Sequence, residues 1–462
     1  MKLYNSLTKQ VENFSPMNPG EVTMYTCGPT VYDYVTIGNY RTYMLGDILY
    51  RTLKYFDYPV KYIMNITDVG HLTGDNEGDA DIGDDRMETS VKKEGKTAQE
   101  IADFYTKDFM KYFKVLNMKE PSKFTRATSY IDQMIELIVD LEDKGCTYQT
   151  EDGIYFDSSK YERYGQLSGL TSDSVMEGAR VESTVRKKNP TDFALWKLSR
   201  GKEQRAQEWN SPWGVGFPGW HIECSAMCLE ELGETVDIHV GGEDLKMIHH
   251  QNEIAQSESA TGKKFVNYWV HGAFLQVDGG RMGKSLGNAY TMEDVVEKGF
   301  IPLSMRYFYL TAHYRSSLNF TWTALESAQN SLKKIYTLVS GYAEDPGAKV
   351  SVDYMSRFDA ALNSDVNMPE ALAVLWDLFK SDVSEESKVA TVVEMDKVLG
   401  LRMSEHIGFE IPKDIQNMAA TREEYRKAGI WDKADMLRRK IEEKGYVVED
   451  HSSGMYRVKR KL

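Results

Sequence analysis

Hydrophobic positions in the first part of the chain alternate between strand-like and helix-like spacing. Residues 22–25 form a short β-type run, and residues 43–49 follow with a helical pattern after a glycine-containing loop. Pro59 should end this helix, because proline cannot continue a helical hydrogen-bond ladder, and residues 61–67 are again β-like. A strand, a helix and a second strand in this order predict a parallel α/β sheet.

The pattern changes before the sheet resumes. Residues 70–95 are rich in Asp, Glu and Gly, which predicts a surface loop and then a charged helix. From residue 121 onward, a helical pattern at 131–144 and two β-type runs joined by Asp152-Gly153 predict an inserted α+β module with a hairpin. The strands expected to complete the main sheet after this insertion are residues 236–240 and 265–270.

Beyond Phe300 the periodicity is helical for about a hundred residues and predicts an antiparallel bundle. Its expected helices are residues 305–312, 322–342, 353–362, 369–380 and 385–399. Ile411-Pro412 then serves as a linker into a tail. There, residues 422–444 favour helices, and residues 446–449 and 455–458 could pair as strands.

Length and composition describe an ordinary multidomain protein. At 462 residues the chain is too long for one core, and about 150 residues per domain predicts roughly three or more domains. No apolar run approaches the roughly 20 residues of a membrane helix, and the first residues do not open a signal peptide. Four cysteines are too few for a disulfide framework, so we expect a cytoplasmic protein with reduced thiols and no membrane contact.

Charge is distributed unevenly along the chain. The formal net charge of −14 argues against a general nucleic-acid coating protein. Residues 413–462, however, carry 13 basic against 9 acidic side chains, a balance of +4 that leaves −18 for the rest. This asymmetry fits a separate tail domain with an anionic partner, although a charged, solvated helix would show it too.

The loop between the first strand and the first helix, residues 26–43, is the first candidate site. Open α/β sheets bind ligands where their strands end. Gly28 and Gly38 would let a ligand approach the backbone, and Cys27 offers a soft metal ligand. The amides after Ile37 would begin a helix whose N-terminus favours phosphate. A tight loop around a buried cysteine explains the same residues equally well.

Cysteine, histidine and glutamate residues provide a candidate metal site. His249 and Glu253 are four positions apart in a helical pattern, so both side chains share one face. Cys224 and Cys27 could add two sulfurs, giving a donor set that suits zinc. Taken singly, each residue is more commonly structural. Cys228 is a rival ligand, and Cys146, in the insertion, is expected to be structural.

Two glycine-containing segments could bind a nucleotide. Residues 279–288 form a glycine-rich loop in which Arg281 and Lys284 suit a mobile clamp on a polyphosphate. In residues 239–244, Asp244 follows two glycines at the end of a strand, where acidic residues often receive ribose hydroxyls. A surface turn and a plain strand-to-helix loop remain the alternatives.

The order of four motifs resembles that of cysteinyl-tRNA synthetases. They are the stretch from Cys27 to Asn39, G-W-H-I-E-C-S-A-M around Cys224, the H-H-x-N-E helix at His249, and the loop x-M-x-K-S-L-G-N around Lys284. D-F-A-L-W-K, M-P-E-A-L and W-D-K-A-D extend the resemblance over nearly the whole chain. Few other families share all of these motifs.

The resemblance implies a class I plan: a Rossmann-like α/β catalytic domain with an inserted α+β connective domain, then a helical bundle and a small C-terminal α/β anticodon-binding domain. The corresponding ranges are 1–120 and 206–278 for the two catalytic halves, 121–205 for the insertion, 279–325 for the signature-loop junction, 326–405 for the bundle and 412–462 for the tail. A monomer is expected.

The implied reaction joins L-cysteine and ATP, with Mg²⁺, into cysteinyl-adenylate and pyrophosphate, and then transfers cysteine to the 3′ adenosine of tRNA(Cys). One Zn²⁺ per chain would bind Cys27, Cys224, His249 and Glu253 and select the substrate thiolate. By resemblance, the amino-acid pocket would include Thr67, Trp220 and His239. The residues that would bind ATP are Thr36, Gly38, Asn39, Gly242, Asp244, Arg281, Lys284 and Ser285. Of these, Thr36, Asn39 and Lys284 would be catalytic. Trp431 and Asp435 match the region that faces the anticodon.

Both signature motifs depart from the family pattern. The first, His-Ile-Gly-His or His-Ile-Gly-Asn in the family, has Thr36 in place of its first histidine. The second, usually Lys-Met-Ser-Lys-Ser, has Arg281 at its first position and Gly283 at its third. Two alternatives stand beside a working synthetase: a ligase that passes cysteine to a small amine, as ligases resembling this family do, and a catalytically weakened paralogue, which Thr36 suggests.

Overall fold

The computed structural model describes residues 1–70, 85–169, 187–199, 205–283, 286–342, 347–408, 411–450 and 456–460. A five-stranded sheet in the order β11-β10-β3-β4-β5 forms its centre, and every neighbouring pair is parallel. The strands are β3 (Val22–Thr26), β4 (Val60–Ile66), β5 (Lys123–Arg126), β10 (Val236–Gly242) and β11 (Val266–Gly272). The Rossmann-like sheet expected from the sequence is confirmed, and its strand order reverses between β3 and β10.

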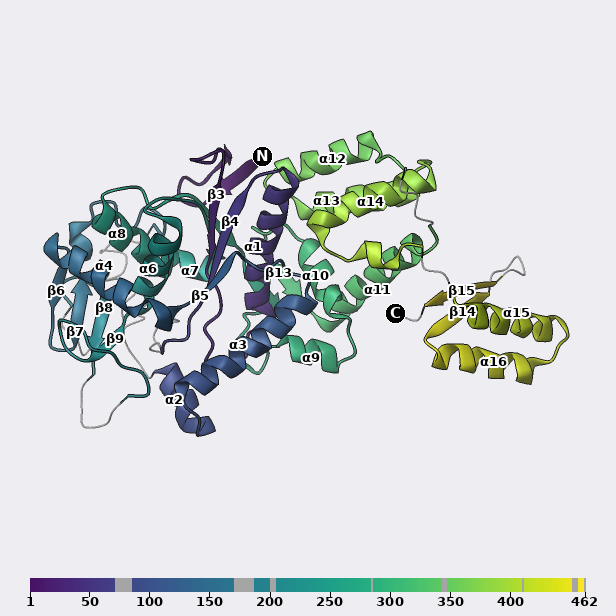
Figure 1. The fold of residues 1–462 in the computed structure, drawn as a ribbon, viewed down its shortest axis with the longest axis horizontal. Helices are drawn as coiled ribbons and strands as arrows, with labels where there is room; N and C mark the ends of the chain where they lie inside the picture. Colours follow the sequence, from purple (N-terminus) through teal and green to yellow (C-terminus); the bar gives the residue numbers. More distant parts are fainter. Residues whose placement is uncertain are drawn as a thin grey trace.

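Helices cover both faces of this sheet (Figure 1). On one face, α1 (Ile37–Tyr55) and α3 (Ala98–Val115) share a core with the bundle, while α6 (Trp220–Leu232) and α8 (His249–Thr261) cover the other. Alternate strand residues divide between the two layers: Met24 packs toward α1, and its neighbour Tyr25 toward α6 and α8. Shorter helices are α2 (Arg86–Glu94) and α7 (Glu243–Met247).

The insertion is an α+β unit with its own antiparallel sheet in the order β6-β7-β8-β9. It comprises α4 (Ile131–Asp143), β6 (Thr147–Gln149), β7 (Gly153–Phe156), β8 (Phe193–Leu198) and β9 (Gly216–Pro218), with 3₁₀ turns at Ala127–Tyr130 and Ser158–Lys160. The predicted hairpin is confirmed as β6-β7.

The expected limits of the insertion, residues 121 and 205, do not coincide with the sheets. The first limit is too early, because β5 pairs with β4 in the main sheet. The second is also too early, because β9 pairs with β8 in the inserted sheet. Both strands are short, and β9 contains a glycine and a proline, so neither has a strong strand pattern of its own.

The remaining elements follow the predicted order. A junction consists of β12 (Leu275–Val277), α9 (Met292–Glu297), α10 (Pro302–Leu310) and β13 (Leu318–Phe320), and β12 pairs with β13 in parallel. The bundle contains α11 (Trp322–Val339), α12 (Val352–Asn363), α13 (Met368–Lys380) and α14 (Glu385–Leu399), followed by a 3₁₀ turn at Met403–His406. An N-terminal hairpin of β1 (Lys2–Asn5) and β2 (Gln10–Asn13) was not predicted.

The tail forms a small unit with its own core. It contains α15 (Lys413–Lys427), α16 (Trp431–Glu443) and the antiparallel pair of β14 (Tyr446–Asp450) and β15 (Tyr456–Arg460). Ile415, Ala419, Ile441 and Val448 are buried together, separately from the other cores. Figure 1 shows this unit at the far right, beyond the bundle. Among the described residues, no helix combines the length and apolarity that crossing a bilayer would require.

The helix α1 is fixed to the bundle through a buried ion network. Asp47 accepts hydrogen bonds from Arg51 Nε at 2.8 Å and from Arg306 Nη2 at 2.7 Å, and all three side chains are buried. Burial alone would raise the pKa of Asp47, but the charges of Arg306 and Arg51 lower it. Arg306 Nε also donates to the carbonyl oxygen of Leu399, and Arg51 Nη1 donates to that of Lys397. One carboxylate thus joins α1, α10 and α14.

We predict that Asp47→Asn destabilises the protein by about 3–5 kcal/mol, because it leaves two buried guanidinium groups without their counter-ion. Asp377→Asn provides the matched control, since the Arg357–Asp377 ion pair is exposed and its loss should cost less than about 1 kcal/mol. Urea unfolding followed by far-UV circular dichroism measures both changes. If both variants lost an equal and small amount of unfolding free energy, the buried network would not be what holds α1 to the bundle.

Candidate active site and metal centre

A cleft of about 240 Å³ opens where β3 and β10 end. These are the strands between which the sheet reverses its order, and such a point is where open α/β sheets bind ligands. The described residues that line it are Cys27, Gly28, Pro29, Thr30, Tyr32, Asp33, Tyr34, Val35, Thr36, Asn39, Thr42, Tyr43, Arg86, Trp220, Gly242, Asp244 and Leu245.

The four predicted metal ligands lie together beside this cleft. Cys27 directly follows β3, Cys224 lies on α6, and His249 and Glu253 occupy the first two turns of α8. One ligand atom from each lies within 4.8 Å of the other three, and all four residues are buried. The helical spacing of His249 and Glu253 brings Nε2 and Oε1 to 3.1 Å. The sequence therefore predicted correctly that these four residues meet.

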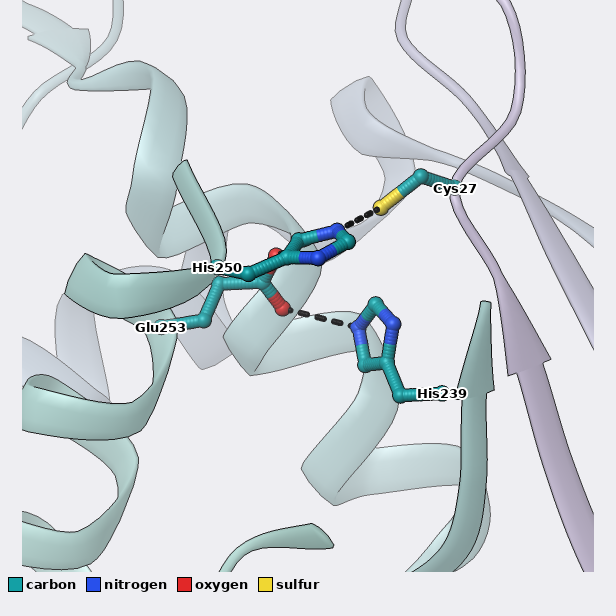
Figure 2. A group of neighbouring side chains, drawn as sticks. All are labelled: Cys27, His239, His250 and Glu253. Atoms are coloured by element: carbon teal, nitrogen blue, oxygen red, sulfur yellow. Dashed lines mark hydrogen bonds and ion pairs between the residues drawn. The ribbon is translucent and has the colours of Figure 1, made fainter. Parts of the chain in front are cut away.

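A second set of ligand atoms shares two of these residues. Cys27 and Glu253 also form a cluster with His239 and His250, again within 4.8 Å (Figure 2). His250 Nε2 lies 3.3 Å from Cys27 Sγ, and His239 Nε2 lies 3.1 Å from Glu253 Oε2. Sequence analysis assigned His239 to the amino-acid pocket and did not identify His250. The adjacent histidines of the H-H-x-N-E motif were the available signal.

Hydrogen bonding and charge within the cluster favour the deprotonated forms of Cys224 and Glu253. A hydrogen bond from Cys27 and the charge of His249 lower the pKa of Cys224 to about 6, against the opposing effect of burial. Burial would raise the pKa of Glu253, but the charges of His239 and His249 lower it to about 2. Burial opposes the charge on His249, yet Cys224 and Glu253 raise its pKa to about 10. At neutral pH the arrangement therefore supplies a thiolate and a carboxylate.

The donor set fits a metal ion. Two sulfurs, an imidazole nitrogen and a carboxylate oxygen are ligands that zinc accepts in tetrahedral sites, where donor atoms lie roughly 3–4 Å apart. Burial of this many ionisable groups would be costly without a compensating charge at their centre. His249 also has second contacts that orient its ring: Nδ1 lies 3.0 Å from His221 Nδ1, and its ring centroid lies 4.3 Å from that of Trp220.

The remaining predicted pocket residues surround this cluster. Trp220 begins α6 and lines the cleft. His239 is buried in β10, with its ring stacked on Trp269 at 4.5 Å. Thr67 is buried after β4, where its Oγ1 accepts a hydrogen bond from Asn65 Nδ2 at 2.9 Å. It does not line the cleft itself, although it forms a β-bridge with Thr30, which does.

The end of β10 supplies the candidate ribose site. Gly242 ends the strand and Asp244 follows at the start of α7, and both line the cleft. A Cβ atom on Gly242 would lie 2.2 Å from Asp244 Oδ1, so a side chain there would displace the Asp244 carboxylate from its position. Burial raises the pKa of the Asp244 carboxyl.

The first signature motif is the N-cap of α1. Thr36 and Asn39 form a capping box: Thr36 Oγ1 accepts from Asn39 N, Asn39 Oδ1 accepts from Thr36 N, and Thr36 Oγ1 donates to Asn39 Oδ1 at 2.7 Å. Ile37 N donates to the carbonyl oxygen of Tyr290. Several of the amides expected to face phosphate are therefore already paired within the protein.

The second signature loop packs against the first. A Cβ atom on Gly38 would lie 3.3 Å from Met282 Sδ, so the glycine serves contact between the two loops. Gly28, likewise, is required by packing, because a Cβ there would lie 1.8 Å from the carbonyl oxygen of Asn65. Arg281 is exposed. Lys284 and Ser285 lie outside the described residues, and so does most of the acidic stretch expected as a surface loop.

The other cysteines are separate from the cluster. Cys228 is buried on α6, one turn after Cys224, and burial raises its pKa well above the usual value. It belongs to neither group of ligand atoms. Cys146 is buried in the insertion, with Sγ 3.8 Å from the carbonyl oxygen of Lys144. Arg86, which lines the cleft, had no recognisable signal in the sequence.

In the tail, Trp431 is 59% exposed at the start of α16, beside the exposed Ile430 and Met436. Asp435 lies on the same helix and contributes to a surface hollow with Met436 and Arg439. An exposed tryptophan beside mixed charges is available to a partner.

Comparisons with known proteins agree with this geometry. The model of the tRNA synthetases class I (C) catalytic domain matches residues 13–330. The chain is 44% identical to cysteine–tRNA ligase 1 of Burkholderia lata, covering 98% of this chain and 96% of the relative. It is 40% identical to cysteine–tRNA ligase of Treponema denticola, covering 98% of both chains.

A solved structure shares the fold at low sequence identity. The methionyl-tRNA synthetase of Mycobacterium tuberculosis, bound by methionyl-adenylate, superposes with a TM-score of 0.54 at 14% identity, covering 84% of this chain and 92% of that one. The parallel sheet, the cleft where its strand order reverses and the relatives matched over their full length all indicate the same family. The chain belongs to the cysteine–tRNA ligase family of class I tRNA synthetases.

Proposed function

We propose that this protein activates L-cysteine with ATP and transfers it to the 3′ adenosine of tRNA(Cys), with a bound zinc ion selecting the cysteine thiolate. The observation that carries the proposal is the buried cluster of Cys27, Cys224, His249 and Glu253 beside a cleft of about 240 Å³. The proposed metal site, which would select the substrate, and the proposed nucleotide site are thus adjacent at the end of β3. The enzyme acts as a cytoplasmic monomer.

The donor residues account for substrate choice. When bound there, zinc supplies a Lewis-acidic partner for the substrate sulfur, which a serine hydroxyl matches poorly. A site built around a specific polar contact can discriminate by about 10⁴–10⁵ without editing. Trp220, whose ring contacts that of His249 in a tilted arrangement and lines the cleft, would limit the volume available to the amino-acid side chain.

The cleft residues account for nucleotide binding. Asp244 would accept hydrogen bonds from the ribose hydroxyls, and Gly242 leaves room for its carboxylate. Thr36 and Asn39 hold the start of α1, whose positive dipole end favours the ATP phosphates. Lys284 and Arg281, with Mg²⁺, would neutralise the charge that grows on the phosphates during displacement. No covalent intermediate with the protein is required.

The tail favours a tRNA substrate over a small amine. A ligase that passes cysteine to a small acceptor does not need an anticodon-binding domain. This chain, in contrast, has a folded tail with an exposed Trp431, which a tRNA could contact. Full-length coverage of the cysteine–tRNA ligases includes this tail. The weakened-paralogue hypothesis rests on Thr36 alone.

We predict cysteine-dependent exchange of pyrophosphate into ATP, followed by charging of tRNA(Cys), with serine giving exchange at least about a thousandfold weaker. Radiolabelled pyrophosphate and acid-gel analysis of tRNA measure the two steps. Exchange without charging would instead support the small-amine ligase. A protein that retains its metal but shows no exchange would be the weakened paralogue.

We predict about one zinc per chain, lost largely in Cys224→Ser, because a serine hydroxyl replaces a thiolate ligand. Cys146→Ser is the matched control, since it changes a buried cysteine outside the cluster. His249→Ala and His250→Ala distinguish the two overlapping donor sets, and only the first should release the metal. Atomic emission after dialysis measures occupancy. Metal loss only in His250→Ala would assign the ion to the set with His239.

We predict that Thr36→Ser keeps exchange activity, while Thr36→Val lowers it at least about tenfold and costs about 1 kcal/mol of stability, because the capping box and the Asn39 contact are lost. Thr97→Val removes an equivalent capping box from α3, away from the cleft, and should lower stability alone. Thermal unfolding and exchange kinetics separate these effects. Unchanged exchange in Thr36→Val would remove Thr36 from the ATP site.

A further inference from the structure

Arg41, at the start of the second turn of α1, is a buried cation whose partners are carbonyl oxygens. Its Nη1 donates to the carbonyl oxygens of Ala273 at 2.7 Å and Phe274 at 2.6 Å. Its Nη2 donates to those of His313 and Ser316. No carboxylate in the described part of the chain forms an ion pair with this guanidinium, and burial lowers the pKa of Arg41 to about 10.

The four carbonyl groups belong to two segments that enter one small sheet. Residues 273–274 lead into β12, and residues 313–316 lead into β13. These two strands pair in parallel, with Leu275 opposite Leu318. One guanidinium therefore joins α1 to the start of both strands.

The second signature loop emerges from the other end of this strand pair. Directly after β12, Asp278 N donates to the carbonyl oxygen of Phe320 at 3.0 Å, and Gly279 N donates to Asn319 Oδ1 at 2.7 Å. Arg281 follows two positions later. Its position relative to the start of α1 therefore depends on how the β12–β13 pair is held against that helix.

The other flank of the same loop is also attached to α1. Ile37 N donates to the carbonyl oxygen of Tyr290, and Thr36 forms a β-bridge with Thr291. The helix thus contacts both flanks of the loop, and Arg41 makes the contact that precedes it in the sequence. A guanidinium suits this contact, because its planar fork presents five donors in a fixed geometry and can bond to two chain segments at once.

We propose that Arg41 is a positioning residue for the activation step: it sets the place of the β12–β13 pair, and with it Arg281, relative to the start of α1. This rests on the proposed function, in which the ATP phosphates lie between the start of α1 and the second signature loop. Burial of a cation without a counter-ion costs free energy, so a geometric role explains why an arginine occupies this position. Because charge grows on the phosphates during displacement, a misplaced Arg281 should affect the rate of reaction more than the binding of cysteine.

The test measures pyrophosphate exchange, metal content and unfolding of Arg41→Lys and Arg41→Gln. Both variants should lower kcat for exchange about tenfold or more, since misplacement of a group by about 1 Å can cost about a hundredfold. KM for cysteine should stay within about twofold of wild type and metal content should be unchanged, because the buried cluster lies on the other face of the sheet. Arg41→Lys keeps the charge, but one ammonium cannot bond to both segments, so the charge alone should not restore kcat.

A double-mutant cycle with Arg281→Ala tests the link between the two arginines. If Arg41 acts through the position of Arg281, the combined loss of kcat should fall short of the product of the two single losses by about threefold or more. Arg306→Lys is the matched control, since it alters another buried arginine that donates to carbonyl oxygens, those of Leu116 and Leu399. It should lower stability and leave kcat of the folded enzyme unchanged.

Asn319→Ala provides a second variant if the Arg41 variants do not fold, because it removes an exposed side chain that fixes the same strand pair to Gly279. It should lower kcat severalfold without changing KM for cysteine. Three results would overturn the assignment: an unchanged kcat in the folded Arg41 variants or, in their absence, in Asn319→Ala; a parallel rise in KM for cysteine; or single losses that multiply fully in the cycle. Failure of the proposed function is distinct, because the wild-type protein would then show no cysteine-dependent exchange.

Discussion

The structure of the site depends on one fully buried carboxylate. Glu253 has no solvent exposure, and its two oxygens face His249 on its own helix and His239 on the central strand, each at 3.1 Å. A charge in such a place persists only with compensating groups around it. Those groups are His239 on β10 and His249 on α8, so the need to satisfy one side chain fixes this helix against the central strand.

This constraint explains why the buried cluster and the cleft adjoin one another. Cys27 is both a member of the buried cluster and a wall of the cleft, and Trp220 contacts the ring of His249 from the cleft side. The two strands that flank the reversal of strand order end here, which opens a crevice that neighbouring parallel strands elsewhere in the sheet do not provide. A substrate sulfur held by the cluster, as proposed, would therefore lie next to the cleft proposed for the nucleotide.

Sequence periodicity predicted the elements that carry their own pattern and missed those that depend on neighbours. The parallel sheet, the inserted hairpin and the bundle helices all have long periodic or turn signals. The strands β5 and β9 lack them, since they are short and are defined by pairing with β4 and β8. In the site, the spacing of His249 and Glu253 was informative, whereas the contact between Cys27 and His250 joins positions 223 residues apart and has no local signal. Arg86 reaches the cleft only because α2 packs beside the loop that contains Tyr32.

The position of α1 follows from contacts at its N-terminus and at its middle. At the N-terminus, Thr36 and Asn39 close the capping box, and Ile37 N is bonded to Tyr290 in the segment after the second signature loop. Further along the helix, Asp47 is bonded to Arg306, which also reaches the end of α14 in the bundle. Gly400 has a left-handed backbone, and a Cβ atom there would come within 2.6 Å of the Arg306 guanidinium. A glycine at this position therefore leaves room for Arg306 to reach α14. Because α1 is held at both places, its orientation relative to β10 is set before any substrate arrives. The departures in the signature motifs therefore change the groups that α1 presents, while its placement is kept.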